Sequence, residues 1–337
     1  MSREQISVQI AEDTHVSEAR RASSRLVHDL QFDSVAEGQA AIIVSELARN
    51  VLLHAAGGEI VLQPGKQEHG NVWVNILALD KGPGIADISR ALSAGYASAG
   101  TRETGLGAVS RLSSIFEVYS RPGEGVAVLA RVVSGSNPTE AVQSTTASVC
   151  VPVAGETRCG DAWEHQDQAG RRLIMVADGL GHGPTASDAA HEALAAFRAN
   201  LHKGPREIIE AAHVRLHKTR GAAVGVAEID FERQVVRYAG VGNIAGVIVS
   251  NGKSRSMISH NGIVGHQCEH IQELAFPWEA DAFLVMHSDG VNARWTLDGY
   301  PGLQCKSAAL IAAVLYRDFK RGRDDATVVV SREARAA

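Results

Sequence analysis

The stretch RRLIMVADGLGHG, residues 171–183, runs from an apolar segment directly into an acid, Asp178, and then into three alternating glycines. A strand, a glycine turn and a helix can form a nucleotide site, because glycines let a pyrophosphate approach the N-terminus of the helix. A carboxylate fixed ahead of the glycines repels a phosphate unless a cation lies between them. The local chemistry is therefore either dinucleotide binding or metal binding.

Three further acidic sites favour the metal. Asp161 follows Gly160, Asp289 follows the apolar run DAFLVMH, and the pair Asp324 and Asp325 precedes the final apolar run ATVVV. All lie at the ends of predicted strands, so folding could gather them at one end of a β-sandwich, in the oxygen-rich cluster that hard divalent cations require. A dinucleotide site would instead need parallel βαβ units and an acid about twenty residues further on. The later strands run in meander order, which disfavours that alternative.

A second group of polar residues and glycines occurs in the first half of the chain. In IVSELARNVLLHA, Glu46 and Asn50 are four residues apart, so a helix would place both on one face. Asp80 ends the apolar run NVWVNILAL, and the glycines around these positions are Gly82, Gly84, Gly105 and Gly107. The last two come just before a predicted helix, whose unsatisfied N–H groups favour phosphate oxygens.

The elements that would hold this second group form one predicted unit. It opens with the strand ISVQI and continues with two helices, at residues 15–30 and 36–55. Further strands are expected at EIVLQ, NVWVNILAL, SIFEVYS and GVAVLARVV, with helices at ADISRAL and from Leu106. Helices on one side and a largely antiparallel sheet on the other predict an α/β sandwich.

The remainder of the chain predicts a second unit made mostly of strands. SGSNPTEAVQSTT is rich in small polar residues, which indicates a linker and divides the chain into 1–133, 134–142 and 143–333. Strands are expected at TTASVCVPV, RRLIMVA, AAVGVAEID, QVVRYAGV, IAGVIVS and DAFLVMHS, and helices at 185–200, 205–218 and 306–319. The order predicts two packed sheets with helices outside, and an α+β class for the whole chain.

The motifs of the first unit, over residues 36–131, resemble the GHKL ATPase superfamily, and within it the anti-sigma-factor serine/threonine kinases. The resemblance implies a Bergerat-type α/β sandwich that binds ATP. Asn50 would hold Mg²⁺ against the triphosphate, Glu46 would act as the base or water-positioning group, and Asp80 would accept the adenine amino hydrogen. The nucleotide loops would comprise Gly82, Gly84, Thr104, Gly105, Leu106 and Gly107, with residues 95–104 as the ATP lid. Phosphoryl transfer fits such a site because it needs positioning and charge neutralisation.

The set GD, ADGLGHG, HSDGV and RDDAT, over residues 145–332, resembles the PPM-type metal-dependent serine/threonine phosphatases, in particular their SpoIIE-like branch. The resemblance implies an α-β-β-α sandwich with two Mn²⁺ or Mg²⁺ ions. The ligands would be Asp161, Asp178, the carbonyl of Gly179, Asp289 and Asp324, and Asp178 would belong to the catalytic centre. A shared water of lowered pKa would attack the phosphorus of phosphoserine or phosphothreonine. Asp325 falls where relatives often carry Asn, so the choice between Asp324 and Asp325 stays open.

Composition restricts the partners. The net charge of −5 offers no basic surface for nucleic acid or membrane, and the absence of an apolar span or signal segment predicts a cytoplasmic protein. Four cysteines without a CxxC pair are expected to be reduced. HVRLH (213–217) and HQCEH (266–270) space histidines as zinc sites do, but both lack the remaining ligand or helix context.

Two resemblances on one chain predict a bifunctional regulator: a kinase unit and an opposing phosphatase unit that act on a STAS-domain phosphoprotein in partner switching. A sigma factor and a stressosome-like assembly are further expected partners, and a homodimer stays open. One alternative keeps the phosphatase and makes the first unit an ATP sensor or docking module. Another has no enzyme activity: the first unit sequesters a sigma factor or STAS protein, and the second is a scaffold.

Overall fold

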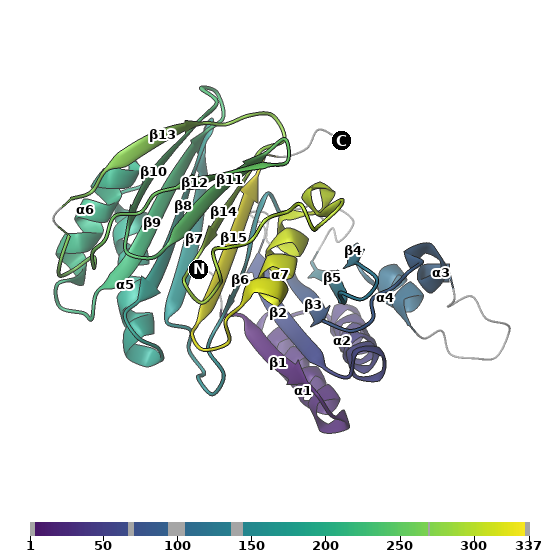
Figure 1. Ribbon diagram of the computed structural model, residues 1–337. Helices are drawn as coiled ribbons and strands as arrows, with labels where there is room; N and C mark the ends of the chain where they lie inside the picture. The colour runs from purple at the N-terminus through teal and green to yellow at the C-terminus, as the bar shows by residue number, and fades with distance from the viewer. Residues whose placement is uncertain (1–3, 67–70, 94–104, 136–143, 269, 334–337) are drawn as a thin grey trace, which may run out of the picture. The chain divides into compact units, whose positions relative to one another are not determined.

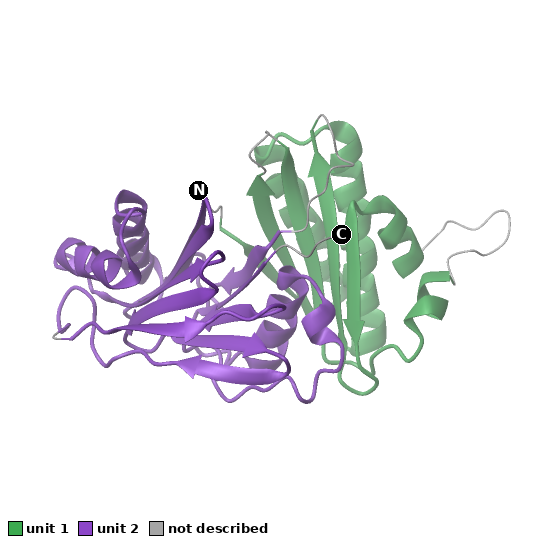
Figure 2. Ribbon diagram, turned by 90° about the horizontal axis from the view of Figure 1, so that it is seen from above, with its two compact units in different colours: residues 1–143 green, residues 144–337 purple. Residues whose placement is uncertain are grey.

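The computed structural model describes residues 4–66, 71–93, 105–135, 144–268 and 270–333. The chain divides into two compact units, residues 1–143 and 144–337, which Figure 2 distinguishes by colour. No helix among the described residues is long and apolar enough to cross a membrane.

The first unit is a five-stranded antiparallel sheet with helices on one face (Figure 1). The strand order is β1-β2-β3-β5-β4, and the bounds are β1 Ile6–Ile10, β2 Gly58–Lys66, β3 Val72–Asp80, β4 Ile115–Ser120 and β5 Val126–Ser134. The helices are α1 Asp13–Asp29, α2 Ser34–Ala55, α3 Ile88–Ser93 and α4 Leu106–Leu112. The order of helices and strands agrees with the sequence patterns of this unit.

Alternation along β3 decides which residues face the helices. Val74, Ile76 and Ala78 belong to the core shared with α1 and α2, so Asp80, at the same parity, is directed to the helical face. The start of α2 is fixed by Asp33, whose Oδ1 accepts the N–H groups of Val35 and Ala36, each at 3.0 Å.

The second unit stacks four layers, α-β-β-α, as the sequence predicts. One sheet has the order β13-β10-β9-β8-β7 and is covered by α5 and α6; the other has the order β12-β11-β14-β15-β6 and packs against α7 through β15 and β6. The bounds in the first sheet and its helices are β7 Asp161–Gln168, β8 Arg171–Gly179, β9 Ala222–Asp230, β10 Val235–Val241, β13 Glu273–Pro277, α5 Pro184–Ala199 and α6 Pro205–Leu216. Those in the second are β6 Thr146–Val151, β11 Ala245–Ser250, β12 Lys253–Met257, β14 Phe283–His287, β15 Ala326–Arg332 and α7 Ala308–Phe319.

Strand β8 separates two cores. Leu173 and Met175 pack against the helices, whereas Ile174 and Val176 pack against the second sheet. Because side chains alternate along a strand, Asp178 is directed to the same inter-sheet face as Ile174 and Val176. The carboxylate of Asp178, at the end of this apolar strand, therefore lies at the edge of the space between the two sheets.

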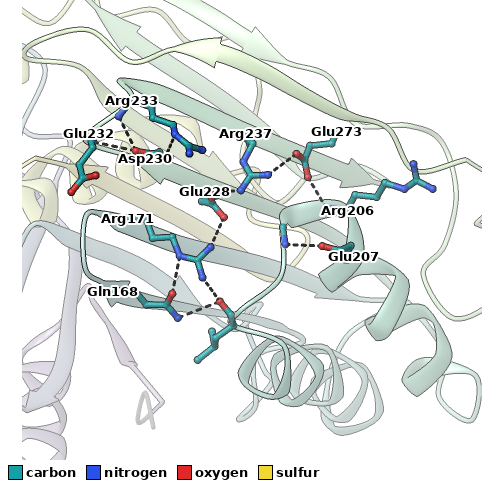
Figure 3. A network of polar contacts seen from close by, with 12 residues as sticks. Gln168, Arg171, Arg206, Glu207, Glu228, Asp230, Glu232, Arg233, Arg237 and Glu273 are labelled. Carbon is teal, nitrogen blue, oxygen red and sulfur yellow. Dashed lines mark hydrogen bonds and ion pairs between the residues drawn. The ribbon is translucent and has the colours of Figure 1, made fainter.

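An ion network around the buried Glu228 connects the strands of the sheet β13-β10-β9-β8-β7 at the end away from Asp178 (Figure 3). Glu228 on β9 is 2% exposed and accepts hydrogen bonds from Arg171 Nη1 on β8 at 3.1 Å and from Arg237 Nη2 on β10 at 2.5 Å. Arg237 Nη1 also donates to Glu273 on β13 at 3.2 Å. Four adjacent strands are thereby cross-linked at the end of β8 that lies away from Asp178.

Several elements depart from the sequence predictions. The polar stretch after Asp161, where no strand was predicted, is the edge strand β7, and β12 and β13 were also missed. Ser134, expected to open the linker, is the last residue of β5, and residues 136–143 lie outside the described part. All four cysteines are free, as predicted.

Candidate metal centre and nucleotide site

The pairing of β7 with β8 places Asp161 directly opposite Asp178. Side chains of directly opposed residues lie on the same face of a sheet, with Cβ atoms about 4.5–5.5 Å apart. The backbone N–H of Gly179 donates to the carbonyl of Gly160 at 3.1 Å, which fixes the two strand ends against each other. Two of the predicted ligands are therefore neighbours.

The other two acidic turns come from the second sheet. Asp289 lies just beyond β14, and Asp325 lies just before β15, which pairs with β14. The turns are in backbone contact, because a Cβ added to Gly290 would lie 1.9 Å from the carbonyl oxygen of Asp325. Glycine at position 290 is thus required for the close approach of these two turns.

Hydrogen bonds connect the acids of the two sheets. Asp161 Oδ2 accepts the hydroxyl of Ser288 at 2.6 Å, and the same hydroxyl accepts the N–H of Thr327 at 3.1 Å. Asp325 accepts two backbone N–H groups, those of Val153 and Gly160, each at 2.8 Å. The start of β7 is therefore linked by hydrogen bonds to Ser288 after β14 and to Asp325 before β15.

The electrostatics show an excess of buried negative charge. Burial, together with the charges of Asp161, Asp289, Asp324 and Asp325, raises the pKa of Asp178 to about 9. Burial also raises the pKa of Asp161 to about 7, against the opposing effect of the Ser288 hydrogen bond. Carboxylates that destabilise one another in a buried place are the arrangement that a divalent cation stabilises, so the residues fit a metal.

The ligand positions themselves are not yet assembled. Among the residues that the structure describes, no three His, Cys, Asp or Glu side chains form a group that could hold a metal ion as they stand. The carboxylates are engaged in other contacts: that of Asp161 with Ser288, and that of Asp289 with Asn243, whose Nδ2 donates at 2.7 Å. The ligand set of Asp161, Asp178, Gly179, Asp289 and Asp324 therefore stays a prediction.

The adjacent acids Asp324 and Asp325 have different surroundings. Asp325 is 3% exposed and its two oxygens accept the backbone N–H groups of Val153 and Gly160. Asp324 is exposed, and its Oδ1 accepts the N–H of Asp325 at 2.9 Å. Asp325 is thus committed to the backbone, whereas Asp324 keeps an oxygen without a recorded partner.

Sequence reasoning missed Ser288 and Asn243. Ser288 lies within the HSDGV motif, but nothing in the sequence indicates that this serine contacts an acid 127 positions away. Asn243 follows β10 in a turn and reaches Asp289 from a different hairpin. Both are recognisable only once the two sheets are stacked.

The predicted polar residues of the first unit lie on α2 and at the end of β3. Glu46 and Asn50 are half-buried on α2, and Glu46 Oε2 accepts the N–H of Gly105 at 3.2 Å. Asp80 ends β3, and its Oδ1 accepts the N–H groups of Gly82 at 2.9 Å and Val126 at 3.2 Å. The helix that carries Glu46 is thereby connected to the start of α4, where the predicted phosphate loop ends.

Two of the predicted glycines are required by close packing. Gly84 has φ +72°, and an added Cβ would lie 2.1 Å from the carbonyl oxygen of Arg121. At Gly107 the added Cβ would lie 2.4 Å from the carbonyl oxygen of Leu92. Leu106 is the first residue of α4, and Thr104, together with the rest of the predicted lid, lies outside the described residues.

At their described residues, the two histidine motifs do not build zinc-peptidase sites. His213 lies on α6 and its Nδ1 accepts the N–H of Gly265 at 3.0 Å, while His217 is the residue after that helix. HQCEH is not helical at its described positions, and His266 Nε2 contacts the carbonyl of Thr219 at 3.0 Å. These histidines are used in local packing and turn contacts.

Comparisons with known proteins match both parts of the chain. Residues 168–333 match the family described as Stage II sporulation protein E (SpoIIE). The N-terminal part is similar to the serine/threonine-protein kinase RsbT of Bacillus subtilis (strain 168), with 32% identity over 127 residues, 38% of this chain and 95% of RsbT. Phosphoserine phosphatase RsbX of the same organism is 24% identical over 139 residues, 41% of this chain and 70% of RsbX.

A solved structure described as "The bacterial stressosome: a modular system that has been adapted to control secondary messenger signaling" has a TM-score of 0.52 at 26% identity. It covers 56% of this chain and 98% of that chain. The match over residues 168–333 and the similarity to RsbX support a protein serine/threonine phosphatase, which confirms the predicted enzyme class. Through its N-terminal part, the chain belongs to the family of the serine/threonine-protein kinase RsbT.

Proposed function

We propose that the phosphatase unit is metal-dependent and removes phosphate from phosphoserine or phosphothreonine in a STAS-domain protein. The observation that carries the proposal is the group of acids around Asp178, where burial and the neighbouring carboxylates raise the pKa of Asp178 to about 9. Asp161, Asp178, Asp289 and Asp324 would hold Mn²⁺ or Mg²⁺, with the carbonyl of Gly179. Two-metal phosphatase sites supply an activated water and stabilise the attacking and leaving oxygens.

The residues of the chain position this centre. Ser288 holds the carboxylate of Asp161 in place, and Asn243 holds that of Asp289. Backbone N–H groups hold Asp325, so Asp325 ties the loops at Val153 and Gly160 to the start of β15 while Asp324 stays available to a cation. Such fixed surroundings lower the reorganisation that catalysis requires.

We further propose that the first unit is a GHKL-type kinase that binds ATP and Mg²⁺ and phosphorylates the same protein. Membership of the RsbT family supports this, as do Glu46 and Asn50 on one face of α2 near the start of α4. Asp80 would recognise adenine beside the turn at Gly82 and Gly84. The similarity to a stressosome chain supports a stressosome-like partner, and a sigma factor is a further candidate.

One observation favours the alternative in which the first unit only senses ATP or sequesters its partner. The carboxylate of Glu46 already accepts the N–H of Gly105 and lies 3.6 Å from Nη1 of Arg49. Engaged in this way, Glu46 would fix the loop rather than act as a base. Incubation with labelled ATP separates the two proposals. If Glu46 is a kinase base, the wild type incorporates phosphate and Glu46→Gln does not, although it still binds ATP. If the first unit is a sensor, the wild type incorporates no phosphate either.

The proposal is tested by metal-dependent turnover. The full chain is expected to hydrolyse p-nitrophenyl phosphate and a phosphorylated STAS protein with Mn²⁺ or Mg²⁺, and Asp178→Asn is expected to lose this activity. Incubation of the unphosphorylated STAS protein with labelled ATP tests the kinase. Hydrolysis that persists in chelator, or in Asp178→Asn, would reject the metal centre.

A further inference from the structure

A cavity of about 530 Å³ adjoins the acids of the second unit. Its lining includes Asp289 and Asp324, together with the segment that follows α7, which supplies Lys320, Arg321 and Arg323. None of these three basic residues has a role in the metal centre as described. The cavity is therefore half acidic and half basic, with the basic half next to the predicted metal ligands.

Backbone contacts hold the basic segment in register with the turn that carries Asp289. The N–H of Arg321 donates to the carbonyl of Gly290 at 2.8 Å, and the N–H of Asn292 donates to the carbonyl of Phe319 at 2.9 Å. Val291 and Lys320 form an antiparallel bridge between these two bonds. The position of Arg321 is thus set by the same turn that sets Asp289.

The two arginines have no partner within the described part of the chain. Arg321 and Arg323 are exposed and make no recorded side-chain hydrogen bond or ion pair, although acids line the same cavity. Two other charged residues of the lining already have partners: Asp318 accepts hydrogen bonds from Nε and Nη2 of Arg317, each at 2.8 Å, and Lys320 Nζ donates to Tyr316 at 3.2 Å. Two guanidinium groups therefore remain available to an external anion.

We propose that Arg321 and Arg323 bind the phosphoryl group of the incoming substrate and are the phosphate-binding residues of this phosphatase. A guanidinium group matches two phosphate oxygens with parallel hydrogen bonds, which a solvated lysine does not do. Positive charge would then contact the phosphate from two sides. Metal ions held by the acids would contact one side, and the two arginines would contact the side that faces the solvent. This inference rests on the proposed phosphatase centre and adds its substrate-binding residues.

The test compares Arg321→Gln/Arg323→Gln with the wild-type full chain, with p-nitrophenyl phosphate as substrate and Mn²⁺ present. Loss of two charge-assisted contacts is expected to raise KM about tenfold or more, with kcat changed less than about threefold. The inhibition constant of inorganic phosphate should rise in parallel. Arg321→Lys/Arg323→Lys, which keeps the charges but not the paired geometry, should recover part of the affinity.

Arg233→Gln is the matched control, because Arg233 is 83% exposed and follows Asp230, at the end of β9 away from Asp178. Its KM should equal that of the wild type. An active wild type with unchanged KM and phosphate inhibition in the double variant would overturn this inference and leave the phosphatase centre in place. A wild type without hydrolysis in either metal would overturn both.

Discussion

In the second unit, Asp178 is the acid whose ionisation is most strongly disfavoured by its surroundings. Its pKa lies at about 9 in the folded chain against 3.8 for an ordinary aspartate. Between these two values the folded state retains a proton that the unfolded state has lost, so the stability of the metal-free protein falls as pH rises through this window. A bound divalent cation would offset that cost.

Asp178→Asn is therefore expected to stabilise the metal-free protein while it abolishes turnover. In chelator, its free energy of unfolding should exceed that of the wild type by roughly 1–3 kcal/mol, and the difference should grow from pH 5 to pH 8. Addition of Mn²⁺ should raise the stability of the wild type more than that of the variant. Urea titrations at both pH values measure this.

The control for that comparison is Asp188→Asn, which removes an exposed carboxylate on α5. Its ion pair with Arg158 is at the surface, where such pairs contribute about 0–1 kcal/mol. A metal-free Asp178→Asn that is no more stable than the wild type at pH 8 would contradict the buried-charge account.

Ser288 is a positioning residue for Asp161. Ser288→Ala removes the 2.6 Å bond to Asp161 and leaves the buried N–H of Thr327 without its acceptor. We expect a loss of roughly 1–2 kcal/mol in stability and a higher metal concentration for half-maximal activity, since Asp161 is no longer held. Ser288→Thr, which keeps the hydroxyl, should restore metal affinity. A purely structural serine would change stability alone and leave the metal dependence of the activity unchanged.

At the scale of elements, the first sheet of the phosphatase unit has acids at one end and the Glu228 network at the other. Glu228→Ala removes the buried acceptor of Arg171 and Arg237, which are 25% and 39% exposed and keep other acceptors, so we expect a loss of about 1–3 kcal/mol. The urea midpoint should fall, with turnover per folded molecule retained at low temperature because Asp178 lies at the other end of β8. Glu232→Ala, an exposed acid in the same hairpin, should stay within about 0.5 kcal/mol of the wild type.

Sequence patterns located the helices and the apolar strands, because both present a regular apolar face. They missed β7, which is an edge strand of DAWEHQDQ: it pairs only with β8, so it needs no apolar run, and its middle residues are partly exposed. That omission hid the direct opposition of Asp161 and Asp178. Asp178, Asp289 and the pair Asp324 and Asp325 were recognisable because each follows or precedes an apolar run, and Asp161 was recognisable by its GD motif.

The sequence could not choose between Asp324 and Asp325, because adjacent acids differ only in what surrounds them. The choice depends on two N–H groups, of Val153 and Gly160, that lie 172 and 165 residues away along the chain. Ser288 and Asn243 were missed for the same reason. Contacts between two stacked sheets do not produce a periodic pattern in the sequence of the strands that carry them.

At the scale of the whole molecule, the chain joins two units, each with a core built from its own strands and helices. The core of the first unit is formed by residues between Val8 and Val132, and the cores of the second by residues between Ala162 and Val329. The proposed ligands also separate: ATP belongs to the first unit, and the divalent pair to the second. A ligand that binds only the folded form of one unit stabilises that unit alone.

Calorimetry of the full chain should therefore show two unfolding transitions that respond to different ligands. ATP with Mg²⁺, at about 100 times its dissociation constant, contributes about 2.7 kcal/mol and should raise the transition of the first unit by about 5 °C or more. Asn50→Ala should abolish that shift, whereas Arg25→Ala, at an exposed position of α1, should keep it. Mn²⁺ without nucleotide should shift only the other transition, and Asp178→Asn should remove most of that shift. A single transition that moves with either ligand would show that the units unfold as one, and an ATP shift that survives Asn50→Ala would remove Asn50 from the nucleotide site.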